Sequence, residues 1–194
     1  MSEVQSLVPQ AKAGRSHVSS LSVIKQQMAL SQSVIPAVIG EYYSYASVFT
    51  YERPLYALMK CKSNKSRMIR EASDLGSELN AFFQFDEDLP RILSVNEASA
   101  LGLLEDADLS GHSNDIWFAP TDLSVEQFMN LRDSRIPAEL ARACQNFLID
   151  RETATELFEG LVVAFMTDNG KYGMFAVEEI TSFSIMIEAC HVLL

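Results

Sequence analysis

Five basic side chains lie within eleven consecutive residues, and this segment contains no acidic residue. The next 38 residues, 71–108, hold ten acidic residues and a single basic one, Arg91. Such a cluster predicts a site for an anionic group of a partner, because ammonium and guanidinium groups bind carboxylates and phosphates through charge-assisted hydrogen bonds. The alternative is a solvated face that pairs with neighbouring acids such as Glu71 and Asp74. The candidate binding residues are Lys60, Lys62, Lys65, Arg67 and Arg70.

The three cysteines and three histidines are the residues that could support nucleophilic catalysis. A nucleophilic thiol needs a base within hydrogen-bonding reach and a third group that orients the base. Cys190 and His191 are neighbours on a predicted strand, so their side chains point to opposite sides of it. Cys144 shares a predicted helix face with apolar residues and is expected in the core. The remaining triad that the sequence allows is Cys61, His112 and Asp115.

One acidic segment begins like a calcium-binding loop. Asp106, Asp108 and Ser110 alternate and are followed by Gly111, as in the first half of such a loop. The twelfth position, which supplies the bidentate carboxylate in a complete loop, is Trp117. The sequence also contains neither glycine-rich phosphate-binding motif. We therefore predict no metal site and no cofactor.

Composition and charge narrow the class of partner. The 194 residues are 48% hydrophobic and carry a formal net charge of −11, which is typical of a globular protein. Such acidity disfavours binding to nucleic acid or to anionic membranes. The odd number of cysteines, the lack of a signal-peptide pattern and the lack of a long apolar segment predict a cytoplasmic protein with reduced thiols.

The C-terminal segment carries the clearest pattern of secondary structure. Asn169-Gly170 separates two apolar stretches, which predicts a β-hairpin with a two-residue type I′ turn. That turn places Phe165 opposite Met174 and Met166 opposite Gly173. Both sides of the hairpin are then apolar, so both require cover. The predicted strands are 161–167, 171–180 and 184–192, and the last is an edge strand unless another segment pairs with it.

Helical spacing predicts helices over much of the remaining chain. Ser94 and Ser124 each begin a capping-box pattern, and Pro137 is placed to begin a further helix. Residues 37–53 combine aromatic and β-branched residues, which favour a strand, with a length that favours a helix, and we interpret them as a helix. The other predicted helices begin at Ser20 and cover residues 55–59 and 64–83, with a short capped turn at 153–156.

These patterns together predict an α+β fold whose helical N-terminal two-thirds packs on a C-terminal antiparallel β-meander. Residues 1–19 are expected to be a flexible arm and residues 20–194 a single domain, which could be subdivided into a helical part, 20–109, and an α+β part, 115–194. We predict a non-catalytic regulatory or assembly protein of microbial or phage type that binds another protein or a second copy of itself. The alternative is an enzyme, a hydrolase or transferase, whose site is assembled from distant residues and could depend on a cysteine.

Overall fold

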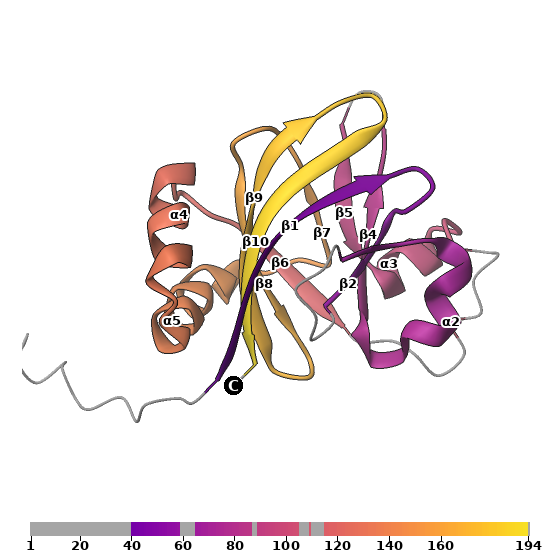
Figure 1. The fold of residues 1–194 in the computed structure, drawn as a ribbon. Helices are drawn as coiled ribbons and strands as arrows, with labels where there is room; N and C mark the ends of the chain where they lie inside the picture. Colours follow the sequence, from indigo (N-terminus) through magenta and orange to yellow (C-terminus); the bar gives the residue numbers. More distant parts are fainter. Residues whose placement is uncertain (1–39, 59–64, 87–88, 105–108, 110–114, 194) are drawn as a thin grey trace, which may run out of the picture. The chain divides into compact units, whose positions relative to one another are not determined.

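The computed structural model describes residues 40–58, 65–86, 89–104, 109 and 115–193. In this part of the chain, ten strands form two antiparallel sheets (Figure 1). Sheet A has the order β1 (Glu41–Thr50), β10 (Ser184–Leu193), β9 (Lys171–Ile180), β8 (Val162–Thr167) and β6 (Ile116–Pro120). Sheet B has the order β3 (Ser66–Arg67), β2 (Leu55–Ala57), β4 (Leu79–Gln84), β5 (Arg91–Ser94) and β7 (Ala154–Glu156).

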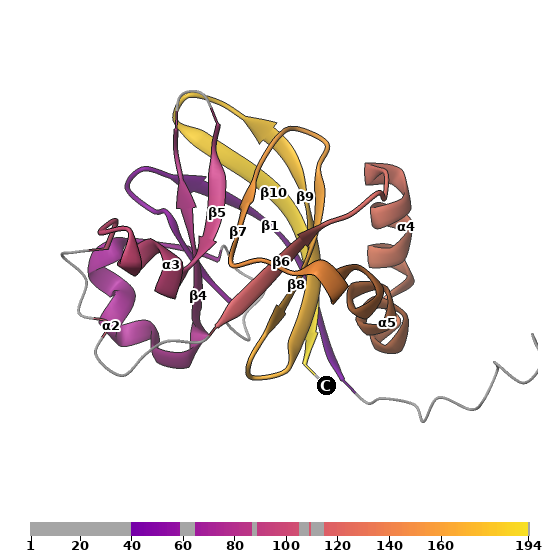
Figure 2. The same cartoon turned by 180° about the vertical axis from the view of Figure 1, so that it is seen from behind.

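The two sheets pack face to face, and helices cover the other face of each sheet (Figures 1 and 2). Helices α4 (Val125–Ser134) and α5 (Pro137–Phe147) pack on sheet A. Helices α2 (Ala72–Leu75) and α3 (Val95–Ala100) pack on sheet B. Three 3₁₀ turns complete the helical segments: η1 (Ile69–Glu71), η2 (Gly76–Glu78) and η3 (Leu148–Asp150). The result is four layers with three apolar interiors.

The predicted helical N-terminal two-thirds is therefore wrong for the described residues. The segments 37–53 and 55–59, interpreted as helices, contain strands β1 and β2. The predicted helix 64–83 is instead β3, a short helical segment from Ile69 to Glu78, and β4. In β1, buried Tyr45, Ser47 and Phe49 alternate with exposed Ala46 and Val48, which is the period of a strand. The capped turn predicted at 153–156 is strand β7.

Local capping signals were reliable where they occurred. The Ser124 hydroxyl accepts a hydrogen bond from the Gln127 amide, and the Gln127 side chain accepts one from the Ser124 amide, at 3.2 and 2.8 Å. The Ser94 hydroxyl caps α3 by accepting a hydrogen bond from the Glu97 amide, at 3.1 Å, and Pro137 begins α5. The predicted arm 1–19 and the helix expected from Ser20 lie outside the described residues.

The three C-terminal strands are confirmed, and other parts of the chain supply both the pairing for the last strand and the cover predicted for the two faces of the hairpin. Strand β10 is not an edge, because it pairs with β9 on one side and with β1 on the other. Both apolar faces of the hairpin are covered by this chain itself, one by sheet B and the other by α4 and α5. The hairpin therefore needs no partner protein to shield its apolar faces.

The hairpin register differs by one residue from the prediction. The loop has three residues, Asp168 to Gly170, and Gly170 alone among them has a positive φ, 80°. Phe165 consequently faces Gly173 rather than Met174. A Cβ atom at Gly173 would lie 2.6 Å from the Cys190 carbonyl oxygen, so glycine is required there by close packing. The shift moves every side chain of β9 to the opposite face from the one predicted.

Candidate functional site

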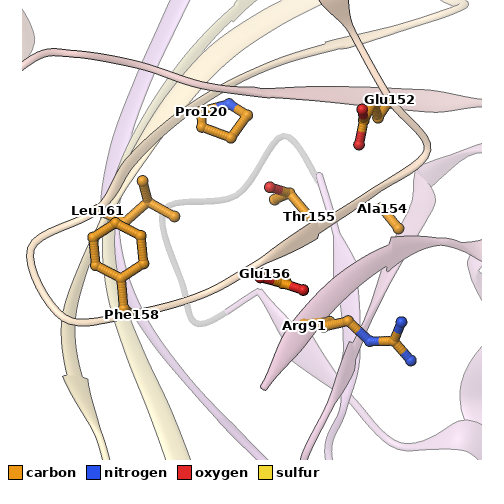
Figure 3. Close-up of a pocket in the computed structure, with 8 residues that line it drawn as sticks. All are labelled: Arg91, Pro120, Glu152, Ala154, Thr155, Glu156, Phe158 and Leu161. Atoms are coloured by element: carbon orange, nitrogen blue, oxygen red, sulfur yellow. The ribbon is translucent and has the colours of Figure 1, made fainter. Parts of the chain in front are cut away.

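The edges of the two sheets meet at a single bridge between β6 and the residues before β7. The Phe118 amide donates to the Glu152 carbonyl at 2.8 Å, and the Glu152 amide donates to the Phe118 carbonyl at 2.9 Å. Beyond this bridge β7 continues along β5, and a hollow of about 410 Å³ opens beside it (Figure 3). We call it the edge hollow. It is lined by Arg91, Pro120, Glu152, Ala154, Thr155, Glu156, Phe158 and Leu161.

The edge hollow combines an exposed aromatic ring with two carboxylates. The Phe158 side chain is 61% exposed, and its loop is held by hydrogen bonds from the Gly160 amide to the Val177 carbonyl and from the Leu161 amide to the Phe158 carbonyl. Glu152 and Glu156 are exposed and form no ion pair with a described residue. The Arg91 guanidinium donates to Gln84 Oε1 at 2.8 Å and is turned away from the Phe158 ring (Figure 3).

A second hollow, of about 560 Å³, lies next to the first and is lined by residues of the β1–β2, β4–β5 and β9–β10 connections. We call it the tip cleft. Pro90 lines the tip cleft and its neighbour Arg91 lines the edge hollow. The Ile180 amide, in the tip cleft, donates to the Glu159 carboxylate next to Phe158. The lining residues are Tyr51, Phe85, Asp86, Pro90, Ile180, Thr181, Ser182 and Phe183.

The tip cleft presents two exposed aromatic side chains on ordered turns. Phe183 is 75% exposed and Tyr51 is 54% exposed. The Thr181 hydroxyl accepts hydrogen bonds from the Ser184 amide at 2.9 Å and from the Phe183 amide at 3.2 Å, which fixes the turn that carries Phe183. The Tyr51 ring lies against the Phe85 ring, with centroids 4.7 Å apart. Contacts within the chain thus hold the Tyr51 ring and the turn that carries Phe183.

The polar side chains that line the two hollows carry hydroxyls, carboxylates and one guanidinium. Their hydroxyl groups are those of Tyr51, Thr155, Thr181 and Ser182, and neither hollow is lined by a histidine, cysteine or lysine of the described residues. In the part of the chain that the structure describes, no three His, Cys, Asp or Glu side chains are grouped to hold a metal ion. No helix there is both long and apolar enough to span a membrane.

The described residues of the predicted basic cluster differ in their exposure to solvent. Lys65 is fully buried, and its ammonium lies 4.8 Å from the centre of the Tyr45 ring. Arg67 is partly buried on β3, where it donates to the Ser66 carbonyl at 2.7 Å. Arg70 is exposed in η1. Lys60 and Lys62 lie outside the described residues, so an anion-binding role for this segment stays a prediction.

The structure places the described cysteines in the interior. Cys144 and Cys190 are both fully buried between sheet A and the helices, and His191 points to the opposite side of β10, as predicted. Burial raises the pKa of the Cys190 thiol to about 11 and raises that of Cys144 as well. Neither is an activated nucleophile. Cys61, His112 and the calcium-like stretch Asp106–His112, apart from Leu109, lie outside the described residues.

The sequence analysis missed both hollows. Phe183 lies just before the last predicted strand, 184–192, and Phe158 lies just before the first, 161–167, and neither was identified as a binding residue. Each lies in a turn with neighbouring small or polar residues, Ser182 and Ser184 in one case and Gly160 in the other. A large aromatic residue in a turn is the signal that could have identified them.

The fold defines a class, an antiparallel two-sheet β protein with a helical layer on each outer face. No family model, no curated protein sequence and no solved structure matches this chain.

Proposed function

We propose that this protein is a non-catalytic protein-binding protein, and that its partner contacts the surface formed by the edge hollow and the tip cleft. One observation carries the proposal. Among the described residues, the large aromatic side chains that are exposed are Tyr51, Phe158 and Phe183, and all three line one of these adjacent hollows. Exposed aromatic residues on ordered turns are typical of the residues that contribute most to protein–protein affinity.

The shape and size of the hollows support the same proposal. Together they place apolar rings next to carboxylates and main-chain groups, which is the mixture found where a protein surface is buried by a partner. Rings fixed by hydrogen-bonded turns lose little conformational entropy when a partner binds. The exposed acids Glu159, Glu178 and Glu179 adjoin the rings in sequence or on β9, and favour a partner with a basic contact surface.

The proposal is tested by removing the exposed rings. Affinity capture from a lysate of the native host, followed by quantitative mass spectrometry, should recover a stoichiometric companion with the natural chain. The double variant Phe158→Ser and Phe183→Ser should lose that companion at least tenfold, since truncating a central aromatic contact costs more than about 1.4 kcal/mol. The control is Ile136→Ser, which removes a 44% exposed apolar side chain at the start of α5.

Three outcomes would contradict the proposal. The first is equal capture of the companion by the double variant and the natural chain, with unchanged melting temperatures. The second is capture of no companion by the natural chain together with a monomer in gel filtration. The third is loss of the companion in the Ile136→Ser variant as well as in the double variant.

A further inference from the structure

Strand β7 presents main-chain groups to the edge hollow that no described residue satisfies. In an antiparallel pair, the hydrogen bonds of successive residues alternate between the partner strand and the opposite side. The Ser94 amide donates to the Thr153 carbonyl at 2.7 Å, and the Leu157 amide donates to the Pro90 carbonyl at 2.8 Å. Residues 153, 155 and 157 therefore bond to the β5 side. The amides and carbonyls of Ala154 and Glu156 face away from β5, and the structure gives them no partner among the described residues.

Contacts occupy part of each of the other long edges, those of β6 and β1. On the outer side of β6, the Phe118 main chain is already bonded to Glu152, and Pro120 has no amide hydrogen. On β1, the Ser47 side chain accepts a hydrogen bond from the Lys65 amide, which brings the chain before β3 against that edge. The outward main-chain groups of Ala154 and Glu156 could thus extend the hydrogen-bond ladder that begins at the Phe118–Glu152 bridge.

The side chains around the outward edge of β7 determine which residue types an added strand would need. Glu152 and Glu156 lie on one side of the chain, since alternate residues of a strand share a face, and small Ala154 lies between them. The other side is lined by Thr155, with Leu161 and Pro120 behind it (Figure 3). A strand laid along β7 would place one set of alternate side chains near the two carboxylates and the other set near Thr155, Leu161 and the Phe158 ring.

We infer that β7 accepts an extended basic segment of another protein as an added antiparallel or parallel strand, with lysine or arginine side chains over Glu152 and Glu156. The inference rests on the proposed function and specifies its partner. A second copy of this chain is the less favourable occupant, because each copy carries a net charge of −11 and like charges repel. Main-chain hydrogen bonds would supply the affinity, and the alternate side-chain positions would supply the specificity.

The probe is the synthetic peptide acetyl-(Lys-Val)₃-Lys-amide at low ionic strength, with acetyl-(Glu-Val)₃-Glu-amide as its acidic counterpart. Hydrogen exchange of individual amides is measured by NMR. We expect the basic peptide to slow exchange of the Ala154 and Glu156 amides about tenfold or more, because an added strand would bond to both. The Thr155 amide, which faces β5, should change little. The acidic peptide should leave all three amides unchanged.

A proline substitution tests the main-chain contact itself. Ala154→Pro removes the outward amide without removing a hydrogen bond to β5, and edge strands tolerate proline. We expect this variant to keep its melting temperature within a few degrees and to bind the basic peptide at least tenfold more weakly. Ala154→Val is the matched control, since it changes the side chain and keeps the amide. Full binding by the valine variant is expected.

Four results of the peptide and oligomer measurements would overturn the inference. They are no protection by the basic peptide at millimolar concentration, equal protection by both peptides, undiminished binding to Ala154→Pro, or a dimer of the natural chain that Ala154→Pro converts to a monomer. The last would assign the edge to a second copy. A lysate companion that survives Ala154→Pro and is lost with the aromatic variants would overturn strand addition alone. A companion that survives the aromatic variants would overturn the proposed function instead.

Discussion

Sheet A separates two interiors of very different character. The interior between the sheets is aromatic and includes ionisable residues: the Phe49 and Phe83 rings stack with centroids 3.9 Å apart, and Lys171 is buried at the start of β9. The interior between sheet A and the helices contains mostly small residues. Its buried members are Ala119, Phe128, Leu140, Ala141, Cys144, Leu148, Val162, Ala164, Met174, Ala176, Cys190 and Val192.

The difference shows how each interior is stabilised. Small side chains on the helical face of sheet A let α4 and α5 approach closely, and apolar burial dominates that interior. The Arg132–Glu188 ion pair, at 2.7 Å, and the hydrogen bond from the Tyr42 hydroxyl to the Arg132 carbonyl, also at 2.7 Å, add to the contact at partly buried positions. The interior between the sheets depends in addition on polar groups that find partners there. The Lys171 ammonium donates to Glu78 Oε2 at 2.7 Å and to the Leu58 carbonyl at 2.9 Å, and the Tyr45 and Tyr56 hydroxyls lie 2.6 Å apart. A lost partner there leaves a buried polar group unsatisfied.

The largest expected effect comes from truncating adjacent residues of β9 that face the two interiors. Phe175→Ala should lower the free energy of unfolding by about 3–5 kcal/mol, because it removes a fully buried ring between the sheets. Met174→Ala, on the helical side, should cost about 2–4 kcal/mol, since the helices can partly close the smaller cavity. Urea denaturation of both variants measures the difference. A larger loss for Met174→Ala would contradict this comparison.

A smaller loss is expected when the buried ion pair is broken. Lys171→Met should cost about 2–3 kcal/mol, because Glu78 and the Leu58 carbonyl both lose their ammonium donor. The cost falls below that of a fully buried pair because the Glu78 side chain is 31% exposed and water partly replaces the contact. Glu78→Gln is the control and should cost less, since its amide oxygen can still accept from Lys171. Equal stability of Lys171→Met and the natural chain would show that the pair is not stabilising.

His191 adds a pH dependence to the interior between the sheets. Burial, together with the nearby Lys65 and Lys171 ammonium groups, lowers the pKa of His191 to about 3. The Tyr43 and Tyr45 rings pack against it. The unfolded chain takes up this proton near pH 6.5, whereas the folded protein does not until about pH 3. Stability from this group is therefore complete above pH 6.5 and is lost as the pH falls towards 3.

His191→Phe isolates this contribution because it keeps an aromatic ring between the tyrosines. Between pH 6.5 and 5 the natural chain should lose about 2 kcal/mol more of its unfolding free energy than the variant does. Urea denaturation across that range measures both. Parallel pH profiles for the two proteins would show that His191 is protonated in the folded state.

The smallest expected effect is on the rate at which the thiols buried between sheet A and the helices are labelled. Cys144 and Cys190 are fully buried, and burial raises the pKa of each. Iodoacetamide at pH 7.5 should therefore label them only as fast as the protein opens, and denaturant should accelerate labelling of both. Mass spectrometry of labelled peptides gives the two rates separately. Rapid labelling of Cys190 in the native protein would support the alternative of a cysteine-dependent enzyme.

The sequence predicted elements whose signals are local. Capping residues identified the starts of α3 and α4, Pro137 identified that of α5, and apolar segments around Asn169-Gly170 identified three strands. It did not predict β1, because the choice between helix and strand at residues 41–50 depends on pairing with β10, near the other end of the chain. The hairpin register was wrong by one residue because two-residue and three-residue loops suit the same Asn-Gly sequence.

The candidate site could not be predicted from the sequence, because it too depends on contacts between residues that are far apart in the chain. Lys65 was predicted to be a surface residue, yet the tyrosines of β1 enclose it. Phe158 and Phe183 gain their significance only because loops from separate parts of the chain meet beside Pro90. Nothing in the pattern around residues 153–156 distinguishes an edge strand from a capped turn.

By itself the sequence determined the helix starts of the C-terminal half, the alternation of apolar residues along the last three strands and the acidic charge. Tertiary structure alone decided which face of β9 meets the second sheet, which lysines are buried and which strand edge stays open. The physical reason is that turn and strand preferences differ by about 1 kcal/mol or less, whereas burial of a whole strand face contributes several times as much. Distant pairing therefore outweighs local preference wherever the two disagree.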